Sequence, residues 1–417
     1  MKSEPRSAGT AAAKKRTEER NTVDKKWKIG VFGTWRGIAF IKALQLIDEA
    51  EVTAICDRDE EKIEAVRPFC PENVVVAPDF DALLDSGIDA VILCNYFYEH
   101  TPYAIRAMER GVHVLSETMP AVTMQECVLL TEAVERTGCI YSFAENYPFS
   151  RANMELSRVY HSGILGEVTF AEGEYVHPMS PEEDRYYAPT PTHWRRYLPK
   201  TYYLTHALAP LMAATDLMPK RVIGKVAAGR AYCSSRGHQG ADGAGILLVE
   251  MEGGALFRVA GSCHFGTRGN WYRLGCEKGD IANVRGTNDK VRLAINEWDL
   301  TEETRNMCTE SIYSPAFTEL GHRAMKCGHY GGDFWVTYHF VQDLLHARQP
   351  YMDVYRAAAI SATGILGWRS VLDDSRQLDI PDFRDRAQRE SYRDDALCPF
   401  PIGGKAPTLP ASFYPAD

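Results

Sequence analysis

Short apolar runs alternate with helix-like segments over residues 27–147, and this alternation constrains the fold more than any other feature of the sequence. Three of these runs are Lys28–Phe32, Val52–Cys56 and Ala90–Cys94. Strands that are apolar on both faces and separated by helices are typical of a parallel sheet covered on both sides. The sequence therefore predicts an α/β class of fold, with an N-terminal Rossmann-like, doubly wound parallel sheet.

The pattern changes after residue 147. A helix is expected at about 150–163, and strands then follow one another with little helical sequence between them, at Glu167–Tyr175, Val222–Ala227, Ile246–Glu252, Ala255–Gly261, Tyr272–Cys276 and Lys290–Ile295. Helical periodicity returns at 334–348 and 354–372. We predict an α+β domain with an open, mainly antiparallel sheet over 148–383, followed by a Pro-rich extended strap at 384–417.

Charge and hydropathy exclude several classes of protein. The 417 residues hold 47 Lys and Arg against 56 Asp and Glu, a net charge of −9. Residues 1–26 carry +4 and are expected to form a disordered tail, which leaves −13 on the rest and argues against a nucleic-acid partner. No apolar run is long enough to cross a membrane, and no apolar secretory segment follows the basic start.

Eleven cysteines occur singly, without a C-x-x-C pair, as expected for reduced thiols. With the absence of a secretory segment, this spacing predicts a cytoplasmic protein.

A glycine turn follows the first predicted strand and opens a helix. It reads Gly33-Thr34-Trp35-Arg36-Gly37, which is shorter than the usual G-x-G-x-x-G and has Trp35 at the middle glycine. Backbone N–H groups at such a turn attract a pyrophosphate, although a purely structural turn would look the same.

Asp57 ends the second predicted strand, 20 residues after Gly37. A carboxylate there hydrogen-bonds ribose hydroxyls and repels a 2′-phosphate, so NAD is the predicted cofactor. The neighbouring Arg58 leaves binding of NADP open, and a helix-capping role remains the structural alternative for Asp57.

Three parts of the chain resemble the glucose–fructose oxidoreductase/inositol dehydrogenase (Gfo/Idh/MocA) family. They are Ile88–His100 with Gly111–Glu117, Asn146-Tyr147 with Gly163–Val168, and His193–Arg195 with Tyr203–Pro210. The resemblance extends from residue 28 to about 383. It implies an NAD-binding Rossmann domain, with Glu117 and the loop after the fourth strand beside the nicotinamide.

The last of these parts looks most like the branch of NAD-dependent glycosidases, such as α-N-acetylgalactosaminidases. Their Tyr-Pro-Thr-His element becomes Tyr203-Leu204-Thr205-His206, and their His-Gly-Gly-x-Asp element becomes His329–Asp333 with one residue inserted. Ordinary family dehydrogenases have Glu-Lys-Pro after the fifth strand, whereas this chain has Glu117-Thr118-Met119-Pro120. The missing lysine fits the glycosidase branch.

These observations define the candidate site residues. Besides the glycine turn, the expected cofactor contacts are Asp57, Arg58, Asn95, Phe97, His100, Glu117, Thr118, Asn146 and Arg195. The expected sugar contacts are Tyr175, Tyr203, Thr205, His206, His329 and Asp333. Each also has a structural alternative, such as a capping His100 or a turn-forming Asn146. No metal site is expected, because no third ligand stands near His329 and Asp333.

Tyr203 and His206 are the predicted catalytic pair. Removal of a hydride from an alcohol needs a base for the hydroxyl proton, and histidine is well suited to that task. If the segment is helical, residues three apart share a face. A structural histidine and a packed tyrosine are the alternative.

Three functions remain open from the sequence. In the first, the enzyme transiently oxidises a sugar C3 hydroxyl, the ketone acidifies the C2 proton, the glycosidic oxygen leaves, water adds, and NAD is regenerated. The second is a net sugar or inositol dehydrogenase. The third is a non-catalytic protein that senses NAD or a sugar. The open face of such a sheet tends to be apolar, and a neighbouring copy can bury it, so we expect a homodimer or homotetramer.

Overall fold

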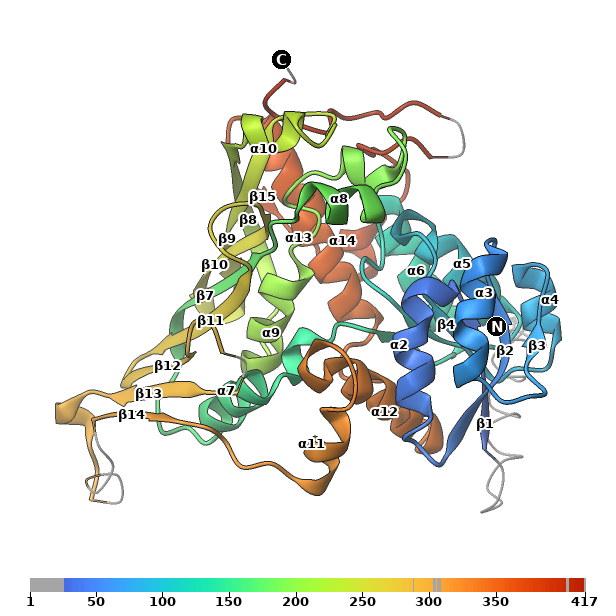
Figure 1. Ribbon diagram of the computed structural model, residues 1–417. Helices are drawn as coiled ribbons and strands as arrows, with labels where there is room; N and C mark the ends of the chain where they lie inside the picture. The colour runs from blue at the N-terminus through green and yellow to red at the C-terminus, as the bar shows by residue number, and fades with distance from the viewer. Residues whose placement is uncertain (1–25, 288, 303–304, 306–308, 403–404, 416–417) are drawn as a thin grey trace, which may run out of the picture. The chain divides into compact units, whose positions relative to one another are not determined.

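The computed structural model describes residues 26–287, 289–302, 305, 309–402 and 405–415 (Figure 1). Apart from Lys26, the predicted N-terminal tail lies outside these residues. The chain forms two compact units. The first contains the residues up to Ala121, Gln125–Asn146 and Phe317–Ala358; the second contains Val122–Met124, Tyr147–Ala316 and the residues from Ala359 onward. Within the described residues, no helix is both long and apolar enough to cross a membrane.

The first unit is built on a six-stranded sheet in the order β3-β2-β1-β4-β5-β6. The strands are β1 (Trp27–Phe32), β2 (Ala50–Cys56), β3 (Val75–Val76), β4 (Ala90–Leu93), β5 (His113–Ser116) and β6 (Tyr141–Phe143). Every pair of neighbours is parallel, which confirms the predicted doubly wound sheet. The order reverses between β1 and β4, and the carboxyl ends of strands beside such a switch point are where these folds bind ligands.

Helices connect these strands. They are α2 (Thr34–Leu44), α3 (Glu60–Val66), α4 (Phe80–Asp85), α5 (His100–Glu109) and α6 (Met124–Thr137), with short 3₁₀ turns at Arg67–Phe69 and Phe97–Glu99. Local sequence explains several ends. Asp59 and Asp79 cap α3 and α4 by accepting from backbone N–H groups, and Gly111 follows α5 with a φ of 72°.

Residues 317–358 join the first unit although they follow the second sheet in the chain. They form α11 (Glu319–Ala324), a 3₁₀ turn (His329–Gly331) and α12 (Gly332–Leu345). Helix α12 packs against α2 and buries Phe334, Val336 and Phe340. Periodicity predicted the helix at this position, but it carries no information about which sheet the helix packs on.

The second unit contains a nine-stranded sheet in the order β14-β13-β12-β11-β7-β10-β9-β8-β15. Its strands are β7 (Val168–Val176), β8 (Pro219–Ala228), β9 (Asp242–Met251), β10 (Leu256–Cys263), β11 (Gly269–Cys276), β12 (Gly279–Asn283), β13 (Val291–Ile295), β14 (Glu310–Tyr313) and β15 (Leu378–Asp379). Only β7 and β10 pair in parallel among these neighbours, so the prediction of a mainly antiparallel sheet is confirmed. The short strands β12, β14 and β15 were not predicted.

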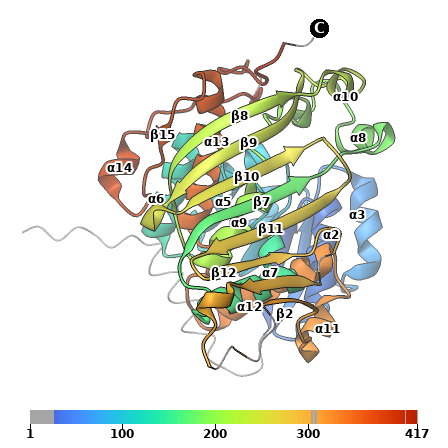
Figure 2. The same cartoon turned by 90° about the vertical axis from the view of Figure 1, so that its left-hand side faces the viewer.

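Helices cover one face of this sheet, as Figure 2 shows for α7, α9 and α13 behind the strands. The helices of the unit are α7 (Arg151–His161), α8 (Pro181–Tyr187), α9 (Thr205–Thr215), α10 (Arg230–Ser234), most of α13 (Val354–Leu372) and α14 (Arg386–Glu390), with 3₁₀ turns at Tyr147–Phe149, Trp194–Tyr197, Glu252–Gly254 and Glu297–Asp299. Gly173 in β7 permits the close approach of α9, because a Cβ atom there would overlap the carbonyl oxygen of Ala207.

The opposite face of the sheet carries a ladder of ion pairs. Arg258 pairs with Glu172 and Glu174, Arg273 with Glu172 and Asp280, and Arg292 with Asp280 and Glu310. Exposed apolar side chains, namely Leu248, Leu256 and Ile312, lie among these pairs. The expectation of an apolar open face is therefore only partly met, since charged pairs alternate with the apolar residues.

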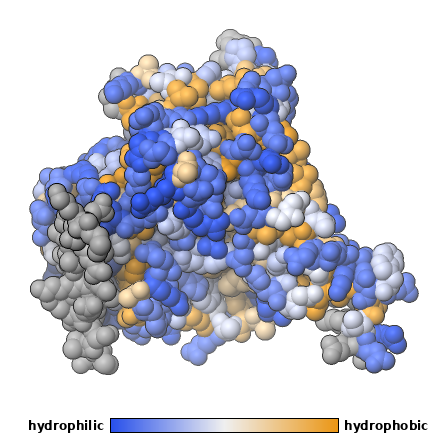
Figure 3. Space-filling model, turned by 180° about the vertical axis from the view of Figure 1, so that it is seen from behind, coloured by the Kyte–Doolittle hydropathy of each residue, from blue (hydrophilic) through white to orange (hydrophobic). Residues whose placement is uncertain are grey.

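Several contacts tie the C-terminal segment to the second unit, among them the ion pair of Arg369 with Asp395 and the hydrogen bonds of a buried carboxylate, Asp242. Asp242 accepts from the backbone N–H groups of Phe413 and Tyr414 at 3.0 and 3.1 Å. The segment is interrupted by the short helix α14, so it is not extended throughout. Seen from behind, the surface is a mixture of hydrophilic and scattered hydrophobic residues, as is usual for a folded protein (Figure 3).

The packing of α9 on β7 gives a test of the second unit. Gly173→Ala should lower the free energy of unfolding by about 1–3 kcal/mol, because the added methyl group displaces α9 from the sheet. Gly269→Ala in β11 is the matched control, since no described atom lies within 4 Å of its added Cβ. Urea denaturation of both variants measures the difference. Equal stabilities of the two variants would contradict this account of the packing.

Candidate active site

The glycine turn joins β1 to α2 at the switch point of the first sheet. Gly33 has a φ of 91°, and a Cβ atom there would lie 2.5 Å from the carbonyl carbon of Cys94. A Cβ atom at Gly37 would lie 2.5 Å from Cγ1 of Val31. The first glycine thus lets the turn pass the end of β4, and the second lets α2 pack on β1. The helix N-terminus beside the turn is suited to a pyrophosphate.

Asp57 braces this turn from the end of β2. Its Oδ2 accepts from the backbone N–H of Thr34 at 2.6 Å and from the Thr34 hydroxyl at 3.0 Å. Its Oδ1 accepts from the backbone N–H of Asp59. The helix cap itself is Asp59, so capping of α3 does not account for Asp57. Arg58 pairs with Glu99 and keeps a side chain that is 65% exposed.

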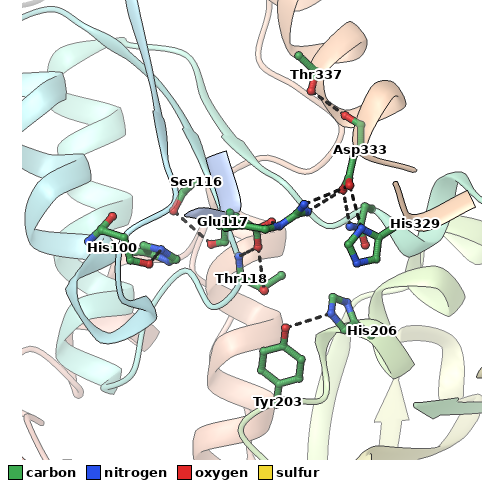
Figure 4. A network of polar contacts seen from close by, with 12 residues as sticks. His100, Ser116, Glu117, Thr118, Tyr203, His206, His329, Asp333 and Thr337 are labelled. Atoms are coloured by element: carbon green, nitrogen blue, oxygen red, sulfur yellow. Dashed lines mark hydrogen bonds and ion pairs between the residues drawn. The ribbon is translucent and has the colours of Figure 1, made fainter. Parts of the chain in front are cut away.

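A buried carboxylate, Asp333 at the start of α12, accepts from three side chains (Figure 4). Arg36 reaches it with two nitrogens at 3.1 and 2.6 Å, and Nδ2 of Asn146 and Nδ1 of His329 each lie 2.9 Å away. Burial alone would raise the pKa of Asp333, but Arg36 and His329 hold it well below its usual value. The carboxylate is therefore ionised. Because protein donors surround it, its placement supports a positioning role more than the predicted contact with a sugar.

Glu117 is the second carboxylate around Arg36. Its Oε1 accepts from Nε of Arg36 at 2.6 Å, and its Oε2 accepts from the backbone N–H and the hydroxyl of Thr118 at 2.8 and 3.1 Å. Burial opposes ionisation, yet Arg36 lowers the pKa of Glu117 below its usual value. The threonine that stands where the family has lysine is thus a neutral partner of the glutamate.

The backbone before Asp333 is strained. His329, Tyr330 and Gly331 have φ values of 52°, 56° and 89°, and the first two are not glycine. Such conformations persist only where surrounding contacts hold them, and they gather at functional sites. The inserted Tyr330 stands 50% exposed, and the turn brings His329 to Asp333 although the segment is not a continuous α-helix.

The loop after β4 contributes three predicted cofactor residues, Asn95, Phe97 and His100. Phe97 is buried. The two ring nitrogens of His100 lie 2.9 and 3.2 Å from the backbone carbonyls of Met119 and Asn95, and the single N–H of the neutral ring donates to one of them. Burial lowers the pKa of His100 and keeps it neutral. We therefore assign it a structural role in the loop.

Two buried acceptor atoms fit a nicotinamide. Oδ1 of Asn95 and Oδ1 of Asn146 have no hydrogen-bond partner among the residues that the structure describes. They follow β4 and β6, at the carboxyl ends of the strands. A carboxamide supplies two N–H donors, so these atoms match the group that the fold predicts there.

Aromatic and histidine side chains form a second cluster, in the second unit. The hydroxyl of Tyr203 lies 3.2 Å from Nε2 of His206 (Figure 4). The His206 ring lies against Tyr147 and Tyr175, with ring centroids 4.4 and 4.7 Å apart. Helix α9 begins at Thr205, so Tyr203 precedes the helix, yet the predicted pair does come together.

His177 is a member of this cluster that the sequence analysis missed. Its ring stacks on Tyr175, with centroids 5.5 Å apart and an angle of 26° between the planes. Burial and the charge of Arg268 lower the pKa of His177 to about 4, so its imidazole is neutral at pH 7. It lies two residues beyond Tyr175 at the end of β7. The alternation of side chains along a strand would have pointed to it.

Two further predicted residues lie in the second unit. The guanidinium of Arg195 lies over the rings of Trp194 and Tyr187, 4.5 and 5.5 Å from their centroids. Its charge also lowers the pKa of Tyr175, but burial dominates and raises that pKa well above its usual value. Thr205 is fully buried, and its hydroxyl has no hydrogen-bond partner among the described residues.

Metal-ligating residues do not gather in the described part of the chain. No group of three or more His, Cys, Asp or Glu side chains there has the geometry to hold a metal ion.

Two segments of the chain match known protein families. Residues 27–145 match the oxidoreductase family with an NAD-binding Rossmann fold, and residues 266–389 match the C-terminal domain of glycosyl hydrolase 109. The first match is to the oxidoreductase family that the sequence resembles, and the second is to the glycosidase branch of that resemblance. The predicted family and its glycosidase branch are therefore confirmed. The family's cofactor is NAD, and this chain is an NAD-dependent enzyme.

Relatives that align with most of the chain are named glycosyl hydrolase family 109 proteins. A glycosyl hydrolase family 109 protein of Shewanella woodyi is 24% identical over 400 residues, covering 85% of this chain and 84% of the relative. One from Saccharopolyspora erythraea is 25% identical over 394 residues, covering 85% and 83%.

Solved structures share the fold at lower identity. A levoglucosan dehydrogenase in complex with NADH and levoglucosan has a TM-score of 0.72 at 15% identity, covering 86% of this chain and all of the other. An oxidoreductase of Agrobacterium radiobacter, in complex with NAD⁺, L-tartaric acid and magnesium, has a TM-score of 0.68 at 15% identity, covering 85% and 98%.

The preference for NAD over NADP tests the role of Asp57. Asp57→Ala should weaken NAD binding by about 1–2 kcal/mol, because charged hydrogen bonds to the ribose are lost, and should narrow the gap to NADP. Titration calorimetry with both dinucleotides measures this. Thr34→Ala is the control, since it removes a hydroxyl partner of Asp57 but leaves the carboxylate. If Thr34→Ala weakens NAD binding as much as Asp57→Ala does, the role of Asp57 is to hold the glycine turn in place and not to bind the ribose.

Proposed function

We propose that the enzyme cleaves a glycoside by transient oxidation at C3 and elimination, with NAD regenerated in each cycle. The observation that carries this proposal is the hydrogen-bonded pair of Tyr203 and His206 in a chain that has Thr118 where family dehydrogenases have lysine. The curated relatives named glycosyl hydrolase family 109 support the same choice of reaction. The substrate class is a sugar linked to a leaving group through its anomeric oxygen.

The residues have separate tasks in this proposal. Glu117 and Asn146 position the nicotinamide, the glycine turn binds the pyrophosphate, and Asp57 binds the ribose. When bound, the cofactor would supply a hydride acceptor, and in its reduced form a hydride donor, at C3 of the sugar.

Tyr203 and His206 handle the protons of the sugar. With a hydroxyl and an imidazole in hydrogen-bond contact, one group can take the C3 hydroxyl proton and the other the C2 proton. Tyr175, His177 and Arg195 lie in or beside the same cluster and form walls for a sugar ring. Thr205 offers its buried hydroxyl there.

Net oxidation of a sugar is the second candidate. The fold similarity to a levoglucosan dehydrogenase favours it, although a similarity at 15% identity establishes only the fold. Incubation with sugars and NAD⁺, followed at 340 nm, separates the two reactions. Accumulation of NADH would favour the dehydrogenase, and cleavage of a glycoside without accumulation would favour the glycosidase.

A panel of nitrophenyl and natural glycosides in D₂O tests the elimination route directly. Removal of the C2 proton followed by return of a proton from solvent should place deuterium at C2 of the released sugar. Mass spectrometry and NMR of the product measure its position. Cleavage of the glycoside without deuterium at C2 would contradict the elimination.

Replacement of the histidine tests the proton-transfer role. His206→Ala should lower turnover by about 10²–10⁴-fold, the usual contribution of a general acid–base group, while NAD affinity changes little. Turnover on an accepted glycoside and NAD binding by fluorescence are measured together. His322→Ala, in α11 of the first unit, is the matched control and should keep turnover. Near-normal turnover of His206→Ala, or loss of NAD binding as its main defect, would contradict the assignment.

We further propose a cytoplasmic homodimer or homotetramer in which the open face of the second sheet is the contact surface. Leu248, Leu256 and Ile312 supply apolar area, and the ion pairs around them supply polar partners. Light scattering at micromolar concentration should give a mass of two or four chains. Leu248→Glu should shift this mass toward that of one chain, and a wild-type monomer would contradict the proposal.

A further inference from the structure

We propose that Asp333 and Glu117 select the oxidation state of the cofactor, by making the nicotinamide end of the site more favourable for cationic NAD⁺ than for neutral NADH. The proposed function explains why such a preference would be useful, because a redox-neutral cycle has to begin and end with NAD⁺. The preference itself is inferred from the charges of the site. Its basis is the count of charges on the side chains that contact Arg36, and it concerns cofactor binding in the absence of any sugar.

The charge count comes from the hydrogen bonds around Arg36. One guanidinium faces two carboxylates, at 2.6 Å from Oε1 of Glu117 and 2.6 Å from Oδ1 of Asp333. Both carboxylates are ionised, because Arg36 lowers the pKa of each despite burial. Burial raises the pKa of the neighbouring Cys94 thiol well above its usual value, so it adds no charge. Two carboxylates therefore share one guanidinium, which leaves one negative charge uncompensated among these three side chains.

The fold indicates which part of the cofactor meets this charge. The pyrophosphate binds at the turn after β1, and Asp57 after β2 marks the adenosine side. The other half of a dinucleotide then extends over the carboxyl ends of β4, β5 and β6, where Asn95, Glu117 and Asn146 follow the strands. Asp333 is joined to Asn146 by a hydrogen bond of 2.9 Å, so the excess charge lies on the nicotinamide side.

The acidic groups alone would not make a binding site, but Asn146 supplies an independent indication of a ligand. Its side chain is 3% exposed, its Nδ2 is bonded to Asp333, and its Oδ1 has no partner among the described residues. An acceptor so placed fits the carboxamide of either form of the cofactor. This hydrogen bond would hold the nicotinamide ring of either NAD⁺ or NADH beside the carboxylates. The difference in affinity between NAD⁺ and NADH would then come from the negative charge of the carboxylates.

Dissociation constants of NAD⁺, NADH and ADP-ribose measured without sugar test this inference. ADP-ribose lacks the nicotinamide and reports on the rest of the site. All three ligands are measured at the same pH and ionic strength. The wild-type enzyme should bind NAD⁺ more tightly than NADH. Asp333→Asn should reduce this preference about tenfold, as expected for loss of one nearby charge, with little change for ADP-ribose.

Asp343→Asn is the matched control. Asp343 is also a buried carboxylate of α12 that pairs with an arginine, Arg348, but it lies ten residues further along the helix from Asp333. This variant should keep the wild-type preference. If Asp333→Asn does not fold, Glu117→Gln removes the other charge and should reduce the preference in the same direction.

Three outcomes would overturn the inference. They are a wild-type enzyme that binds NADH as tightly as NAD⁺ or more tightly, an Asp333→Asn variant that loses affinity for all three ligands equally, and an Asp343→Asn variant with the same loss of preference. None of these depends on glycoside cleavage. An enzyme that selects NAD⁺ in this way but cleaves no glycoside would contradict the proposed function and leave this inference intact.

Discussion

The ion pair between Arg36 and Asp333 is the interaction on which the cofactor site depends. It joins the glycine turn to a helix almost 300 residues later in the chain. Removing one partner of a buried pair typically costs about 3–5 kcal/mol, because the other charge is left without compensation. Here Asp333 also holds Asn146 and His329, so its loss would release the end of β6 and the strained turn before α12 together.

The turn in this protein works differently from a standard dinucleotide fingerprint. The two glycines, Gly33 and Gly37, are present because Cβ atoms at these positions would collide with the end of β4 and with β1. Trp35 stands at the position of the middle glycine, and the residue after it, Arg36, is charged. The Arg36 guanidinium pairs with the carboxylates of Glu117 and Asp333. The turn therefore contributes a positive charge as well as backbone N–H groups.

Local pattern was enough to predict the first sheet and the general form of the second. Apolar runs and glycine turns are determined by residues close together in sequence, and Asp57 and Glu117 follow strands where such folds place functional groups. The pairing of Tyr203 with His206 could also be predicted, because the two residues are only three apart in sequence.

The remaining features depend on contacts between distant parts of the chain. The sequence gives no local signal that α12 packs beside α2, and so Asp333 was predicted to touch sugar when it is enclosed by protein donors. His177 was not predicted, because it follows β7 directly and its stacking on Tyr175 depends on how far the strand extends. The strands β12 and β14 were not predicted. They have only five and four residues, which is too few for an alternating pattern to be recognised.

The return of residues 317–358 to the first unit has a consequence for how the protein is made. A ribosome releases the glycine turn early, but Asp333 emerges only after strands β7 to β14 of the second sheet have been synthesised. Until then Arg36 and Glu117 lack the third member of their cluster. The nucleotide-binding unit therefore cannot be completed during early synthesis, and a gene fragment ending near residue 147 encodes its sheet without its electrostatic centre.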